Sequence, residues 1–199
     1  MSQHKINIIL DIDQTLISSE ETNKFNKTHK KKMEQFEHKN FEDLYLIFSR
    51  PYLQGFLDFL FDNFNVSIWT AASKNYALFI VDKFILNKPN RKIDFIFFSY
   101  HCKISMKNSK KLKDVSLLWD YFKLSKYAKD NTIIIDDNPL VKEAQVCNCF
   151  AIKPFYFFDK DSEKDSELIS VTSKLASLKT YLENNKTHHC LIDVCVNNI

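Results

Sequence analysis

Short apolar runs alternate with amphipathic stretches along the chain. The first run, residues 6–16 with the sequence INIILDIDQTL, indicates a buried strand that leads into two acidic residues. Further short runs rich in β-branched or aromatic residues predict strands at 65–69, 95–99, 132–135 and 149–152. Strands that alternate with helices are typical of an α/β fold with a central parallel sheet and helices on both faces.

Apolar residues at helical spacing predict three longer helices between and after these strands. The first follows Arg50 and Pro51, because proline is favoured in the first turn of a helix. The second begins after Ser73, whose hydroxyl is a natural N-cap. The third is the amphipathic stretch 168–182.

Two polar stretches interrupt the alternation. A small insertion after the first strand is expected at about 18–49, with residues 18–39 as a partly helical or mobile flap and 41–48 as a returning strand. Residues 103–113 are lysine-rich and are expected to be irregular, and 114–122 are expected to form a short helix or turn.

The length of 199 residues suits one domain with an insertion and allows a sizeable core, which 18 phenylalanines make aromatic. We expect residues 1–185 to form that domain and 186–199 to form a tail or an extra strand, with the strand at 190–196.

Composition excludes several kinds of site. Gly55 is the only glycine, so neither a glycine-rich phosphate loop nor a dinucleotide-binding fingerprint is present. The net charge of +3 does not favour nucleic acid binding across the whole surface. Low glycine with abundant lysine, asparagine, isoleucine and phenylalanine is typical of an A/T-rich coding genome, such as that of a virus or a parasite.

Cysteine spacing and hydropathy bear on the compartment. The five cysteines are odd in number and fit no zinc pattern, which favours free thiols in a reducing compartment. His188 and His189 beside Cys190 are interpreted as a solvated tail rather than a metal tract. Because no run of 18 apolar residues and no signal-peptide layout is found, we expect a soluble intracellular protein with no membrane partner.

The end of the first strand carries the clearest candidate chemistry. Asp11, Asp13 and Thr15 would share one face if the strand continued. Two such carboxylates raise each other's pKa, and a hard cation such as Mg²⁺, which prefers oxygen ligands, removes that cost. The alternative is a solvated turn after a strand.

Residues at the ends of other predicted strands favour the cation site over the solvated turn. Asp136 and Asp137 repeat the pattern after another apolar strand, and Thr70 lies between a strand end and a helix start. With Lys113 as a positive charge, these residues are the parts needed for phosphoryl transfer at one edge of a parallel sheet. Thr70 could instead only cap a helix, and Lys113 could be an ordinary surface lysine.

Five segments narrow the chemistry to a family: LDIDQTL, SRPYLQGFLDFL, SIWTAASKNYA, KLKDVSLL and IIDDNP. In this order they resemble the small phosphatases that act on the C-terminal domain of RNA polymerase II, the NLI-interacting-factor-like family of the haloacid-dehalogenase superfamily. The resemblance covers Ile6 to Leu182. It implies a three-layer Rossmann-like haloacid-dehalogenase fold and a Mg²⁺-dependent phosphoserine/phosphothreonine phosphatase whose partner is a phosphorylated protein, with the polymerase domain as the expected substrate.

The resemblance also implies roles for individual residues. Asp11 would be the nucleophile that forms an aspartyl-phosphate, and Asp13 would be the general acid and then the base. Thr70 and Lys113 would bind the phosphoryl oxygens. The Mg²⁺ ligands would be Asp11, Asp13 through its backbone carbonyl, Asp136 and Asp137. The further substrate-binding candidates are Thr15, Ala71 and Arg50, although Arg50 is better explained as the anchor of a helix start.

Besides Gln14 and Tyr52, which have no direct chemical role, the chain departs from the family at two points that bear on the site and the substrate. Asp137 stands where the family often has asparagine, which adds a negative charge to the metal site. The stretch between Ser18 and Arg50 matches poorly, and in the family it helps to select the peptide. Two alternatives therefore stay open: a phosphatase of the same fold that acts on a nucleic-acid end or a small molecule, and a non-catalytic module that binds phosphopeptides.

Overall fold

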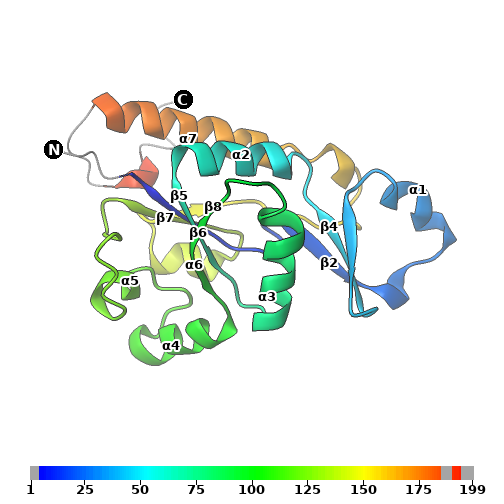
Figure 1. Ribbon diagram of the computed structural model, residues 1–199, viewed down its shortest axis with the longest axis horizontal. Helices are drawn as coiled ribbons and strands as arrows, with labels where there is room; N and C mark the ends of the chain where they lie inside the picture. The colour runs from blue at the N-terminus through cyan, green and yellow to red at the C-terminus, as the bar shows by residue number, and fades with distance from the viewer. Residues whose placement is uncertain (1–4, 185–189, 194–199) are drawn as a thin grey trace.

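The computed structural model describes residues 5–184 and 190–193, and its centre is a parallel sheet (Figure 1). The sheet has the strand order β6-β5-β1-β7-β8. Its strands are β1 Asn7–Leu10, β5 Asn65–Trp69, β6 Ile93–Phe97, β7 Thr132–Asp136 and β8 Cys149–Ala151. Every neighbouring pair is parallel, with Leu10 opposite both Ile68 and Ile135. The apolar runs thus form these strands because both faces of the sheet are covered.

Helices cover the two faces, which confirms the three-layer α/β architecture. On one face α2 (Leu53–Asn63), α3 (Lys74–Ile80) and α7 (Glu167–Asn184) pack on Ile8 and Leu10 of β1. A single π-helical turn, η3 (Val81–Ile85), continues α3. On the other face α4 (Ser99–Ser109), α5 (Leu117–Asp120) and α6 (Pro139–Ala144) surround Ile9 and Ile134.

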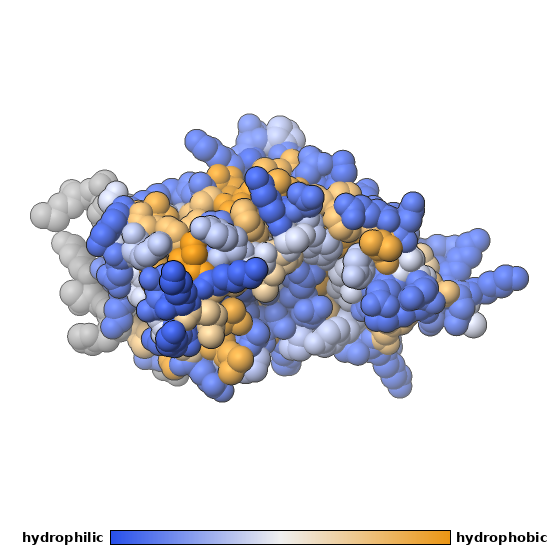
Figure 2. Space-filling view, turned by 90° about the horizontal axis from the view of Figure 1, so that it is seen from below, coloured by the Kyte–Doolittle hydropathy of each residue, from blue (hydrophilic) through white to orange (hydrophobic). Residues whose placement is uncertain are grey.

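The expected insertion is a second, antiparallel sheet with the order β2-β4-β3. Its strands are β2 Ile17–Glu21, β3 His38–Phe41 and β4 Tyr45–Ser49, and the short helical segments between β2 and β3 are η1 Thr22–Lys24, η2 Lys27–His29 and α1 Lys30–Met33. In Figure 2 the outer end of the insertion, at the right, is covered mostly by hydrophilic side chains.

An aromatic cluster joins this sheet to the segment after β8. Phe48 of β4 stacks on Phe157 with ring centroids 3.9 Å apart. Phe25 and Phe36, in the segment between β2 and β3 that contains α1, also contact Phe157. The insertion is therefore packed against the rest of the molecule.

Four expectations about elements are wrong. Residues 18–39 hold two strands, β2 and β3, rather than only a flap. Most of 103–113 belongs to helix α4, because Cys102 and Ser105 bury one side of it, and α6 follows Pro139 where no helix was predicted. Expected strand 95–99 lies two residues earlier, as β6.

The C-terminal segment is described only in part. Cys190, Leu191 and Ile192 are buried against the core, and residues 191–193 form a helical turn rather than the expected strand. The rest of the expected strand and tail lies outside the described residues. Four cysteines, Cys102, Cys147, Cys149 and Cys190, are free thiols. Within the described ranges, no helix has both the length and the apolar character needed to span a membrane.

Candidate active site

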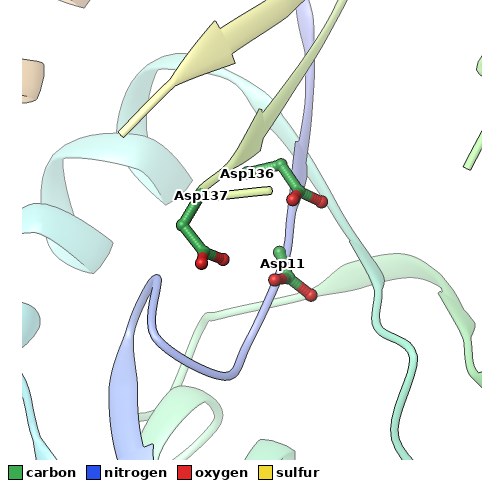
Figure 3. A group of neighbouring side chains, drawn as sticks. All are labelled: Asp11, Asp136 and Asp137. Carbon is green, nitrogen blue, oxygen red and sulfur yellow. The ribbon is translucent and has the colours of Figure 1, made fainter. Parts of the chain in front are cut away.

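The ends of β1 and β7 bring the two acidic pairs together. Because Leu10 pairs with Ile135, the next residues, Asp11 and Asp136, lie side by side, and the Asp11 amide donates to the Ile135 carbonyl at 3.0 Å. One carboxylate oxygen from each of Asp11, Asp136 and Asp137 lies within 4.8 Å of the others. Figure 3 shows the three carboxylates gathered around one space, so the predicted convergence is confirmed.

Lys113 is buried between two of these acids. Its ammonium nitrogen Nζ lies 2.6 Å from Asp11 Oδ1 and 2.7 Å from Asp136 Oδ2. Burial alone would lower the pKa of Lys113, but the charges of Asp11 and Asp136 outweigh it and raise that pKa. Lys113 is thus a fixed positive charge in the site and not a surface lysine.

The backbone around Lys113 is held in an uncommon conformation. Lys113 has φ 49°, in the left-handed region that costs a non-glycine residue energy. The Gln145 side chain donates from Nε2 to the Lys113 carbonyl and accepts at Oε1 from the Val115 amide, each at 2.9 Å. Gln145 therefore fixes the peptide that carries the ammonium.

Asp13 lies in a tight loop between the two sheets. Gln14 has φ 59°, and its amide donates to the Ile17 carbonyl at 2.8 Å, which closes the loop. The Tyr76 hydroxyl donates to Asp13 Oδ1 at 2.8 Å. Burial raises the pKa of Asp13 to about 6; the Tyr76 hydrogen bond opposes this shift, and the charge of Asp11 adds to it. A carboxyl group in this range can both give and take a proton near neutral pH.

Thr15 and Arg50 hold the far side of the loop. The Thr15 hydroxyl donates to Asp137 Oδ1 at 3.3 Å, and its carbonyl accepts from Arg50 Nη1 at 3.1 Å. Arg50 also forms a two-bond ion pair with Asp165, each bond 2.9 Å long. Since Arg50 is 1% exposed and its guanidinium is occupied, we retain the anchoring interpretation for it.

Thr70 follows β5, the neighbour of β1, and lies at the same edge of the sheet. Its hydroxyl accepts from the Ala72 amide at 3.1 Å, so it does act as a local cap. The Thr70 side chain is buried, whereas the next residue, Ala71, is exposed. Both capping and phosphate contact are compatible with this placement of Thr70.

The site fits a hard divalent cation. The carboxylates of Asp11, Asp136 and Asp137 cluster together, with Asp13 close to Asp11, and within the described residues the ammonium of Lys113 pairs with Asp11 and Asp136 alone. Burial and the charge of Asp11 raise the pKa of both Asp136 and Asp137, against the opposing charge of Lys113. Oxygen donors with excess negative charge are the set that Mg²⁺ prefers.

Three residues important to the site's geometry were not predicted from the sequence in these roles. Tyr76 lies in the helix predicted after Ser73, without a role for its hydroxyl, and no sequence pattern points to Asp165. Gln145 was not singled out. Tyr76 offered one weak signal, a hydroxyl on a face that is otherwise aliphatic or phenylalanine, since a buried hydroxyl needs a partner.

Comparisons with known proteins agree with this geometry. The fold resembles that of Fcp1, described as an essential RNA polymerase II CTD phosphatase, with a TM-score of 0.68, 14% identity, and coverage of 95% of this chain and 69% of that one. Fission yeast Fcp1-R271A bound to beryllium fluoride gives a TM-score of 0.66 at 15% identity, with the same coverage. At these identities the similarity shows a shared fold.

Two viral proteins are more similar to this chain in sequence than these solved structures are. The CTD phosphatase-like protein 355R of invertebrate iridescent virus 6 is 50% identical over 175 residues, which cover 85% of this chain and 96% of that protein. Its namesake in invertebrate iridescent virus 3 is 39% identical over 180 residues, or 86% and 96% of the two chains. Residues 6–186 match the profile of the NLI interacting factor-like phosphatases. The chain therefore belongs to the NLI interacting factor-like phosphatase family.

Proposed function

We propose that the protein is a Mg²⁺-dependent phosphatase that removes phosphate from phosphoserine or phosphothreonine in a protein through an aspartyl-phosphate. The observation that carries this proposal is the buried cluster in which Asp11, Asp136 and Asp137 converge beside Lys113. Asp11, Asp136 and Asp137 would hold the metal ion with the Asp13 carbonyl. When bound, the ion neutralises phosphoryl oxygens and the attacking carboxylate.

In the first step the Asp11 carboxylate attacks phosphorus, and the bond from phosphorus to the serine or threonine oxygen breaks. Asp13 gives its proton to the departing oxygen, so the product leaves as an alcohol. The raised pKa of Asp13 agrees with this role, since part of the population carries that proton near neutral pH. Lys113 and Thr70 would bind the oxygens of the transferred group.

In the second step water attacks the aspartyl-phosphate, and Asp13, now ionised, takes a proton from that water. The bond between phosphorus and the Asp11 oxygen breaks, which restores the carboxylate and releases inorganic phosphate. The hydroxyl of Tyr76 and the tight loop at Gln14 keep Asp13 on the side of the site where both proton transfers occur.

The proposed substrate class rests on relatedness. Relatives carry names that refer to the polymerase C-terminal domain, and we propose a phosphorylated protein segment of that kind as the substrate. Free thiols agree with a reducing compartment, so we place the activity inside the cell, in the cytoplasm or nucleus of the host if the chain is viral.

Hydrolysis of p-nitrophenyl phosphate with and without Mg²⁺ tests the proposal. We expect turnover only with the metal, and we expect Asp11→Asn to lower kcat to background because an amide cannot attack phosphorus. Asp82→Asn, the same change at an exposed aspartate of η3, is the matched control and should leave kcat unchanged. Turnover in Asp11→Asn at the wild-type rate would remove Asp11 as the nucleophile.

A panel of substrates separates the remaining alternatives. Preference for phosphopeptides over nucleotides and 3′-phosphorylated oligonucleotides supports the protein substrate, and the reverse order favours a nucleic-acid end or a small molecule. Phosphopeptide binding without any metal-dependent turnover would favour a non-catalytic module.

A further inference from the structure

Helix α4 carries a stripe of unpaired positive charge that the proposed reaction does not use. Residues 95–113 contain five lysines and no acidic residue. Lys113 is in the active site, and the other four, Lys103, Lys107, Lys110 and Lys111, are exposed. Within the described parts of the chain, none of these four side chains forms an ion pair or a hydrogen bond that would offset its charge.

The exposed side of α4 is one continuous face. Tyr100, Lys103 and Lys107 are spaced i, i+3 and i+7, so they lie on the same side of the helix, opposite the buried Cys102 and Ser105. Tyr100 is 60% exposed. Like charges at i and i+4, as at Lys103 and Lys107, repel each other, and nothing within the helix compensates them. We call Tyr100, Lys103 and Lys107 on this face, together with Lys111 two residues beyond the end of α4, the α4 stripe.

Both ends of the stripe are attached to the active site. At the start of α4 the Ser99 amide donates to the Ala72 carbonyl at 2.8 Å, and Cys102 Sγ donates to the Thr70 carbonyl at 3.5 Å. After its end, Ser105 Oγ donates to the Lys111 carbonyl and accepts from the Asp114 amide, next to Lys113. The stripe therefore has a fixed position relative to the site. In Figure 1 α4 lies at the lower edge, and Figure 2, seen from that side, shows hydrophilic side chains that project between hydrophobic areas on the left half of the face.

We infer that the α4 stripe binds an acidic or additionally phosphorylated segment of the polypeptide substrate, next to the residue being dephosphorylated. This inference rests on the proposed function. The stripe from Tyr100 to Lys107 is about 10 Å long, at 1.5 Å per helical residue. An extended peptide covers that length in roughly three residues, so the acidic groups would lie about three to five residues from the target phosphate.

A short peptide fits the stripe better than a nucleic acid does. A nucleic acid carries a charge every few Å along its length and needs a long basic surface. The lysines here occupy one short helix and the residues just after it, in a chain whose net charge is only +3. The exposed Tyr100, in the first turn of α4, supplies apolar area that can pack against peptide side chains.

The test compares three phosphoserine peptides: one with neutral flanks and two with a pair of glutamates three and four residues before or after the phosphoserine. We expect the wild type to favour one of the acidic peptides over the neutral one by roughly fivefold in kcat/KM, since exposed ion pairs are individually weak. Lys103→Gln/Lys107→Gln/Lys111→Gln should remove that preference. Its hydrolysis of p-nitrophenyl phosphate, which has no flanking acidic segment to contact the lysines, should match the wild type.

The control variant Lys27→Gln/Lys30→Gln/Lys31→Gln removes three exposed lysines from the insertion and changes the net charge equally. We expect it to keep the preference, so a loss there would move the binding surface to the insertion and overturn the inference. Equal kcat/KM for all three peptides in the wild type, or an unchanged preference in the α4 variant, would also overturn it.

Binding of the same peptides to Asp11→Asn protein, followed by fluorescence anisotropy, separates this inference from the proposed function. If the wild type shows no turnover but the acidic peptide is still selected through α4, the proposed phosphatase activity is refuted and the inferred binding surface stands. A fall in oligonucleotide binding in the α4 variant without any change in peptide selection would assign the stripe to nucleic acid instead.

Discussion

Tyr76 shows how a single hydroxyl can tune the proposed proton transfers. Its side chain reaches from α3 across to the loop after β1 and donates to Asp13 at 2.8 Å. Burial and the charge of Asp13 raise the pKa of Tyr76, so the hydroxyl keeps its proton and stays a donor. A hydrogen bond to the ionised carboxylate favours that form, which is why it opposes the effect of burial on Asp13.

Tyr76→Phe removes this donor and leaves the ring in place. The pKa of Asp13 should rise, because its ionised form loses a partner. If Asp13 must be protonated for the first step, the alkaline limb of the kcat/KM profile should move to higher pH. Rates measured from pH 5 to 9 check this, with the exposed Tyr121→Phe as the control. A profile that moves to lower pH would contradict the role given to Tyr76.

Lys113 carries the strongest constraint among the individual residues. Its backbone is left-handed and its ammonium is buried, and both features are costly unless neighbours compensate them. Asp11, Asp136 and Gln145 supply that compensation. The sequence placed Lys113 in the site by resemblance, whereas the role of Gln145 depends on α6 and the α4–α5 segment meeting in space, which no local pattern reveals.

Helices and strands whose buried residues are all apolar could be predicted from the sequence. Those whose buried side is small or polar, or whose residues are mostly exposed, could not. Strand β5 has the expected bounds because Val66 to Trp69 are all buried. Helix α4 was missed because its buried side is made of Cys102 and Ser105, which give no hydrophobic period against five nearby lysines. Strand β3 was missed because three of its four residues are exposed and the strand owes its place to pairing with β4.

The insertion sheet should depend on the aromatic contact that fixes it. Phe157 is fully buried and stacks on Phe48, whereas its neighbour Phe158 is 38% exposed. Phe157→Ala should lower the free energy of unfolding by about 3–5 kcal/mol, as a cavity forms in a packed cluster. Phe158→Ala is the matched control and should cost under about 1.5 kcal/mol, since it buries less area. Urea unfolding compares the two, and similar losses would mean that the cluster is not the main attachment.

At the scale of the whole molecule, the site is the place where separate segments meet and where several carboxylates gather around one lysine. The end of β1, the end of β7 and the segment before α5 contribute Asp11, the pair Asp136 and Asp137, and Lys113. The two acidic pairs could be predicted because both follow apolar strands of one parallel sheet. The excess negative charge they create makes the metal-free protein less stable than its packing alone would allow.

Asp137→Asn tests whether the acidic cluster lowers the stability of the metal-free protein while it strengthens metal binding. Burial and Asp11 raise the pKa of Asp137, so the folded protein holds that proton more tightly than the unfolded chain does. Its ionised form therefore destabilises the metal-free fold above the folded pKa, and this cost fades as the pH falls through that value. Without metal at pH 7.5, we expect Asp137→Asn to melt about 2–4 °C higher than the wild type.

Added Mg²⁺ should reverse the order of the two proteins. A ligand that binds only the folded state raises its stability with concentration, and the wild type, with one more carboxylate, should gain more. Thermal melts over a Mg²⁺ titration, with and without EDTA, measure both effects in one experiment. Asp82→Asn at the surface controls for the change in net charge and should respond to Mg²⁺ as the wild type does. If Mg²⁺ raises the melting temperature of Asp137→Asn as much as that of the wild type, the metal ion lies away from Asp137. If the metal-free variant melts at a lower temperature than the metal-free wild type, the charge of Asp137 is already compensated in the folded protein.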